Sequence, residues 1–145
     1  MRAWVLGPAF ARSRYGVAGF GAWALLVIVL VPSLAAQEKT SVKAGVYTEA
    51  QADRGLAVFR SKCASCHAPN RFTDDLFYTS FAGKPLWEMF DVISDSMPED
   101  DPGGLKKEEY ADVIAYLLKL NNFPTGSSDL PVDKDALSAI LMEKP

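Results

Sequence analysis

Two cysteines and a histidine lie close together in the segment Cys63-Ala64-Ser65-Cys66-His67. The pattern C-x-x-C-H is typical of covalent haem attachment. Positions i, i+3 and i+4 of a helical turn share one face, so both sulfurs and the imidazole can converge on one flat ligand. Each thiol can form a thioether to a haem vinyl group, and a ring nitrogen of His67 can then reach the iron. We therefore predict that this segment holds one haem c.

Three other uses of such a motif compete with haem attachment. A redox disulfide of the thioredoxin type requires the motif beside a βαβ pattern, and no run of alternating or β-branched residues here would build that sheet. A structural zinc site takes about four ligands, whereas this motif supplies three unless a carboxylate joins them. A plain structural disulfide is not excluded by two cysteines alone. Haem attachment is the interpretation that the sequence favours.

The second axial ligand of such a haem must be something other than histidine, because His67 is the only histidine in the chain. Four methionines are available, and three of them lie in the N-terminal signal, on an apolar helical stripe or in the terminal tail. Met97 lies in an expected loop, where Pro98 favours an extended backbone at the preceding residue. An extended backbone can project the thioether toward a fixed point. We predict Met97 as the second iron ligand; the alternative is a loop methionine that packs on the haem edge.

The N-terminal 36 residues have the features of an export signal. Three arginines precede an apolar run from Tyr15 to Leu34, and the small residues Ala35-Ala36 follow it. A basic start, an apolar centre and a small-residue cleavage site are typical of a secretory signal. We predict residues 1–36 as a Sec-type signal and residues 37–145 as one periplasmic domain. The alternative is an uncleaved anchor that tethers the domain to the membrane, because the run approaches the length of a spanning helix.

The charge balance limits the choice of partners. The chain has 145 residues, with 18 acidic and 15 basic side chains, and three of the basic ones lie in the expected signal. The mature part therefore carries 12 basic against 18 acidic residues, a balance that argues against nucleic acid as a partner. Its length of about a hundred residues is small for an independent core. A buried haem would supply apolar surface that the side chains lack.

Helices are expected on both sides of the motif. A capping box of Thr48 and Gln51 predicts a helix that ends near Lys62 and leads into the two cysteines. Gly55 costs this helix about 1 kcal/mol relative to alanine, so it suggests the close approach of another helix around residues 115–116.

Further helices are expected to begin at Pro85, which suits the first helical position, to run from about Lys106 to Leu120, and to follow Asp133. Between residues 68 and 84 we expect a loop. Its aromatic side chains either cover a porphyrin face or pack in an ordinary core.

This ordered set of motifs resembles the class I c-type cytochromes. The set comprises the C-x-x-C-H motif after a helix with Gly55 and Phe59, a later Met97-Pro98, and a closing segment Tyr110–Leu118. The resemblance is nearest to the small monohaem cytochromes found beside, or fused to, quinoprotein (PQQ-type) dehydrogenases. Segments similar to three stretches of this chain recur there: Gly83-Lys84-Pro85-Leu86-Trp87, Met97-Pro98-x-x-x-Pro102-Gly103 and Asn122-Phe123-Pro124-x-Gly126.

The resemblance implies an all-α cytochrome c fold, with three main helices and a short C-terminal helix around one covalent haem c. It also implies thioethers at Cys63 and Cys66 and iron ligation by His67 and Met97. With both axial positions filled, iron has no open site for oxygen or peroxide, and the thioether together with burial raises the reduction potential. We expect an electron carrier rather than an enzyme, acting between a periplasmic dehydrogenase and the respiratory chain. The alternatives are a haem subunit of a larger quinoprotein dehydrogenase and a small peroxidase-like enzyme.

Acidic residues cluster around Met97 in the sequence, namely Asp91, Asp95, Glu99, Asp100 and Asp101. They favour redox partners with basic docking surfaces, on the donor dehydrogenase and on the acceptor oxidase or cytochrome. The alternative is a solvated acidic face that serves solubility. The membrane is a partner only if the N-terminal segment stays uncleaved.

Overall fold

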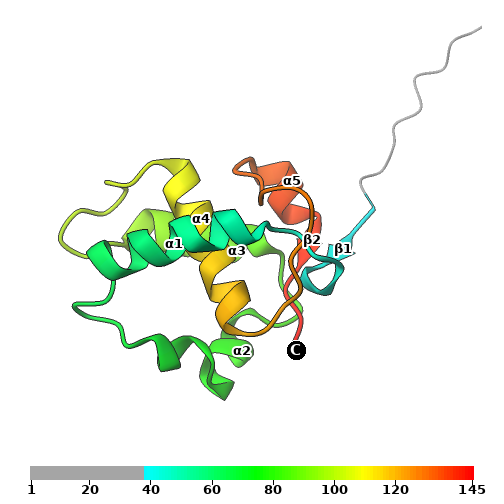
Figure 1. Ribbon diagram of the computed structural model, residues 1–145, viewed down its shortest axis with the longest axis horizontal. Coiled ribbons are helices and arrows are strands. Elements are labelled where there is room, and N and C mark those ends of the chain that lie inside the picture. The colour runs from blue at the N-terminus through cyan, green and yellow to red at the C-terminus, as the bar shows by residue number, and fades with distance from the viewer. Residues whose placement is uncertain (1–37) are drawn as a thin grey trace, which may run out of the picture. The chain divides into compact units, whose positions relative to one another are not determined.

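A computed structural model describes residues 38–145 of the chain (Figure 1). The predicted signal at residues 1–36 lies outside the described residues. The described part contains five α-helices, two 3-10 turns and one pair of two-residue strands. This helical content confirms the predicted all-α class. None of the helices in residues 38–145 has the length and hydropathy of a membrane span.

Helices α1 (Glu49–Lys62) and α4 (Lys107–Leu120) cross at the centre of the described part, as Figure 1 shows. The side chain of Thr48 accepts a hydrogen bond from the Gln51 N–H at 3.0 Å, so Thr48 begins α1 as predicted. The capping box is not completed, because the Gln51 side chain hydrogen-bonds to the Leu130 backbone instead. Gly55 lies at the crossing. A Cβ added there would lie 1.8 Å from the carbonyl oxygen of Asp112 and 3.0 Å from the Cβ of Tyr116. The predicted close approach of another helix is therefore confirmed.

Helix α3 (Leu86–Ser96) packs against α4 and against the C-terminal elements. It begins one residue later than predicted, because Pro85 is extended, with φ −61° and ψ 145°, and caps the helix instead of opening it. The predicted tail helix is α5 (Lys134–Ser138), where the Asp133 side chain accepts from the Ala136 N–H at 2.8 Å. Capping by a short polar side chain explains why α5 begins where the sequence predicts.

Two strands join the ends of the described part. The strand β1 (Thr40–Ser41) pairs in parallel with β2 (Ile140–Leu141), with Thr40 opposite Ile140, and the 3-10 turn η1 (Val42–Ala44) follows β1. This pair is not predicted from the sequence. Two-residue strands carry no alternation of apolar and polar positions, which is the pattern that identifies a strand.

The prediction of a loop between residues 68 and 84 is wrong. This segment contains the 3-10 turn η2 (Pro69–Phe72) and helix α2 (Asp75–Phe81). Asp74 caps α2 by accepting from the Phe77 N–H at 2.9 Å. Phe77 is buried, whereas Leu76 is exposed. A helix of two turns with one buried side chain shows too little periodicity to be recognised in the sequence.

Candidate functional site

A cavity of about 760 Å³ lies between the end of α1, helix α3 and helix α4. Its volume falls within the range of about 300–1,000 Å³ that is usual for cofactor and ligand sites. All four residues that the sequence predicts as site residues line this one cavity: Cys63, Cys66, His67 and Met97. The structure thus brings together two segments that are separated in the sequence.

The C-x-x-C-H segment folds as a tight turn directly after α1. The N–H of Cys63 donates to the Phe59 carbonyl at 2.9 Å, and the N–H groups of Cys66 and His67 donate to the Cys63 carbonyl at 3.1 and 2.9 Å. The two cysteines of the described residues are not joined in a disulfide; Cys63 is half-buried and Cys66 is exposed. Burial raises the pKa of the Cys63 thiol above its ordinary value.

Aromatic rings form the wall beside His67. The ring of Phe72 stands edge-on to the His67 ring, with 5.8 Å between the centroids, and Phe72 also contacts Phe59 and Phe77 edge-on. Phe72, Phe77 and Phe81 all line the cavity. The aromatic side chains expected in a loop therefore include members of the cavity wall, although they lie on η2 and α2.

Asn121 holds the segment that carries Phe72, a role that is not predicted from the sequence. This side chain is 3% exposed and donates to the Phe72 carbonyl at 2.8 Å and to the Leu117 carbonyl at 2.7 Å. The hydroxyl of Tyr78 donates to the Asn121 amide oxygen. An asparagine after a helix predicts only that the helix ends, so no sequence pattern connects Asn121 with residues more than forty positions earlier.

Met97 lies directly after α3 and lines the same cavity. Its backbone is extended, with φ −128° and ψ 149°, as the following proline predicts. Its carbonyl oxygen accepts a hydrogen bond from the Tyr110 hydroxyl at 2.7 Å. Met89, which the sequence places in the core, is buried as expected and also lines the cavity. The structure therefore places two thioethers, and not one, on the cavity wall.

The rim of the cavity beside Met97 is acidic. Glu99, Asp100 and Asp101 line the cavity and are exposed, whereas Lys62 lines it from the end of α1. None of these three carboxylates takes part in an ion pair within the described residues. Asp91 and Asp95 are exposed on α3. The cavity therefore combines apolar and aromatic walls with an acidic edge beside Met97 and one basic side chain, Lys62, at the end of α1.

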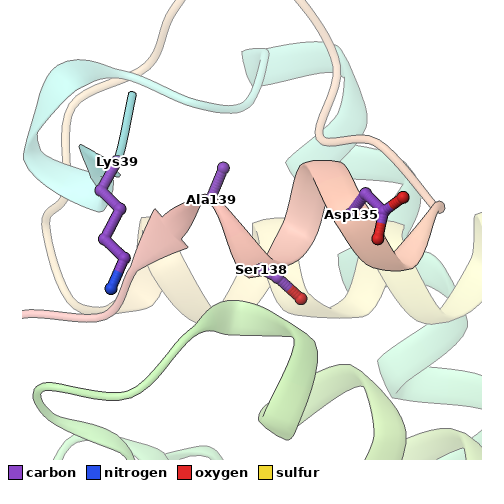
Figure 2. Close-up of a pocket in the computed structure, with 4 residues that line it drawn as sticks. All are labelled: Lys39, Asp135, Ser138 and Ala139. Atoms are coloured by element: carbon purple, nitrogen blue, oxygen red, sulfur yellow. The ribbon is translucent and has the colours of Figure 1, made fainter. Parts of the chain in front are cut away.

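A second hollow, of about 250 Å³, lies beside α5 (Figure 2). Its lining consists of Lys39, Asp135, Ser138 and Ala139, and none of these residues lines the larger cavity. Figure 2 shows Lys39 and Asp135 toward opposite ends of this group. Within the described residues, Ser138 makes no hydrogen bond to Lys39 or Asp135, and those two charges form no ion pair with each other. The residues that the sequence predicts as site residues all lie on the larger cavity.

Residues 50–117 match the family model described as cytochrome C oxidase, cbb3-type, subunit III. The match supports a class I monohaem c-type cytochrome. The fold is accordingly the predicted cytochrome c fold, and its cofactor is covalently bound haem c. A cytochrome c domain is typical of an electron carrier that works with redox partner proteins. No curated protein and no solved structure matches the chain, and the association with quinoprotein dehydrogenases stays a prediction.

The residues on the cavity wall fit haem c. The matched range contains all four predicted site residues. Two free thiols, one imidazole and a thioether lie on the same cavity as the apolar side chains Phe59, Ile93, Leu105, Val113 and Leu117. Thiols for the covalent links, axial donors for iron and an apolar surface for the ring are the three requirements of this cofactor.

Proposed function

We propose that this cytochrome carries single electrons outside the cytoplasm, between a periplasmic dehydrogenase and the respiratory chain. Residues 1–36 serve as its Sec-type export signal, and residues 37–145 form the mature domain. Cys63 and Cys66 hold the haem covalently, and His67 and Met97 are its axial iron ligands. The presence of these four side chains on one cavity, from segments thirty residues apart, is the observation that supports the proposal.

Each proposed role follows from the chemistry of the side chain. The S–H bond of each cysteine adds across one vinyl group, so that sulfur bonds to one carbon and hydrogen to the other, with no net oxidation. When bound, haem c would supply an Fe(III)/Fe(II) couple for one-electron transfer between a donor and an acceptor. The His67 imidazole and the Met97 thioether would both hold the iron, so that no position would be left on it for a substrate. The thioether and the apolar walls favour Fe(II) and therefore a high reduction potential.

Covalent attachment is the first testable part of the proposal. Protein produced in a host that matures c-type cytochromes should retain its haem absorbance on the polypeptide after denaturation and acid extraction. The double variant Cys63→Ser/Cys66→Ser should release all of its haem, because no thioether can form. The variant Ser65→Ala is the matched control, since it changes the same turn without removing a thiol. Wild-type polypeptide that emerges without colour, or loses its haem on denaturation, would overturn the proposal.

The proposed partners carry basic docking surfaces that face the acidic rim. Glu99, Asp100 and Asp101 lie at the mouth of the cavity, so their field acts where electrons would enter and leave. The negative carboxylates of this rim repel anionic reagents and attract cationic ones, and dissolved salt weakens both effects. Steering of this kind alters association rates more than affinity.

Two small oxidants of opposite charge test the rim without a known partner. The reduced cytochrome should react with tris(phenanthroline)cobalt(III) more slowly as salt is added, and with ferricyanide more quickly. In the double variant Glu99→Gln/Asp100→Asn, both reaction rates should depend less on the salt concentration. The double variant Glu38→Gln/Asp135→Asn removes the same charge from exposed positions that do not line the cavity, and it should behave as wild type. Trends that stay unchanged in the rim variant would show that the rim does not steer.

A further inference from the structure

One buried hydroxyl ties together the two ends of the segment 97–105, which includes Met97 and the acidic rim. The Tyr110 hydroxyl donates to the Met97 carbonyl at 2.7 Å and accepts from the Leu105 N–H at 3.4 Å. Tyr110 lies on α4, is 2% exposed, and packs edge-on against Phe90 with 6.1 Å between the ring centroids. The hydroxyl is therefore fixed by a packed ring on one of the two crossed helices.

The rest of this segment has few other attachments. Residues 99–104 are exposed, and the internal hydrogen bonds run from the Asp101 N–H to the Pro98 carbonyl and from the Gly104 N–H to the Asp101 carbonyl. Met97 itself is attached to α3 through its N–H, which donates to the Ile93 carbonyl. In residues 38–145, Tyr110 is the one side chain outside the segment that hydrogen-bonds to it. The position of the Met97 backbone relative to α4 therefore depends on this contact.

We propose that Tyr110 is a positioning residue that holds Met97 within reach of the haem iron and limits displacement of its thioether. The inference rests on the proposed function, in which Met97 is the axial ligand. Without the hydroxyl, the Met97 carbonyl and the Leu105 N–H lose their partner, and both ends of the segment can move away from α4. An opened segment moves the thioether away from iron and exposes the site to other ligands.

The variant Tyr110→Phe tests the proposal, because phenylalanine keeps the packed ring and removes only the hydroxyl. Added imidazole serves as the competing ligand for the oxidised cytochrome. Its binding is followed as loss of the thioether-to-iron charge-transfer band. We expect displacement about tenfold faster in Tyr110→Phe at the same imidazole concentration, which corresponds to the net contribution of one buried hydrogen bond.

Tyr47→Phe is the matched control. Tyr47 is fully buried, and its hydroxyl donates to the Phe123 carbonyl at 2.6 Å, but it does not line the cavity. Both variants should lose stability to urea by a similar amount, since each loses a buried hydroxyl-to-carbonyl bond. Only Tyr110→Phe should accelerate imidazole binding. Equal rates in wild type and Tyr110→Phe, or equal acceleration in both variants, would overturn the positioning role.

The charge-transfer band of Met97→Leu separates the two possible failures. If the band persists in Met97→Leu, then Met97 is not the ligand, and the proposed ligand set falls together with the role of Tyr110. If Met97→Leu loses the band but Tyr110→Phe exchanges its ligand at the wild-type rate, the proposed function stands and only the inference about Tyr110 is wrong.

Discussion

Replacement of Met97 by leucine should abolish the thioether-to-iron charge-transfer band of the oxidised cytochrome and lower its reduction potential. Leucine has a similar volume but offers no donor atom to iron. Because axial ligands and their surroundings set haem potentials over about 0.8 V, we expect a fall on the order of 0.1 V or more. The reduced variant should also bind carbon monoxide, whereas the wild type should not. Absorption spectra and a redox titration measure all three effects.

Met89→Leu is the matched control for this experiment, because Met89 is the second methionine on the cavity wall. It lies on α3, is 1% exposed and belongs to the core. We expect Met89→Leu to keep the charge-transfer band when oxidised and not to bind carbon monoxide when reduced. The reverse pattern, with the band lost in Met89→Leu and kept in Met97→Leu, would move the axial role to the helical methionine.

The parts of the site that the sequence could predict are those whose geometry is local. The spacing of Cys63, Cys66 and His67 determines how they lie on one turn, and the backbone hydrogen bonds of that turn span only four residues. The extended backbone of Met97 likewise depends on the proline directly after it. Neighbouring residues are enough to predict such features, and the structure places all four side chains on one cavity.

The supporting residues could not be predicted in this way. Tyr110 contacts Met97 across 13 positions, and Asn121 contacts Phe72 across 49 positions. In the sequence, Tyr110 belongs to an ordinary apolar helical stripe and Asn121 to an ordinary helix end. Their roles arise only when α4 is placed between α3 and η2, which depends on the packing of the whole domain.

The fold shows the same division between local and distant effects. Capping by Thr48 and Asp133 fixed the starts of α1 and α5 as predicted. The pairing of β1 with β2 joins residues a hundred positions apart, and the Gln51 side chain exchanges hydrogen bonds with the Leu130 backbone at 2.6 and 3.2 Å. These contacts attach the C-terminal segment to α1 and to the first described residues, and they carry no pattern that the sequence alone reveals.

The crossing of α1 and α4 leads to the prediction with the largest effect on stability. Gly55→Ala should destabilise the protein by about 2 kcal/mol, because overpacking costs up to about 3 kcal/mol and alanine recovers about 1 kcal/mol of helix propensity. The added Cβ would lie 1.8 and 2.4 Å from the carbonyl oxygen and carbon of Asp112. These are backbone atoms of a buried helix, so the clash is relieved only if the two helices move apart. Urea unfolding followed by circular dichroism at constant temperature measures the loss.

Two further variants identify backbone contact as the cause. Gly104→Ala is the control, because its added Cβ would meet only the Asp101 carboxylate, an exposed side chain that can rotate away, and we expect a change within about 0.5 kcal/mol. The cost of Gly55→Ala should be the same in a Tyr116→Gly background, which lacks the Tyr116 Cβ at 3.0 Å, as in the wild type, since the Asp112 carbonyl is the nearer obstacle. Disappearance of that cost in the Tyr116→Gly background would mean that side-chain packing, and not the approach of the two backbones, requires glycine at this position.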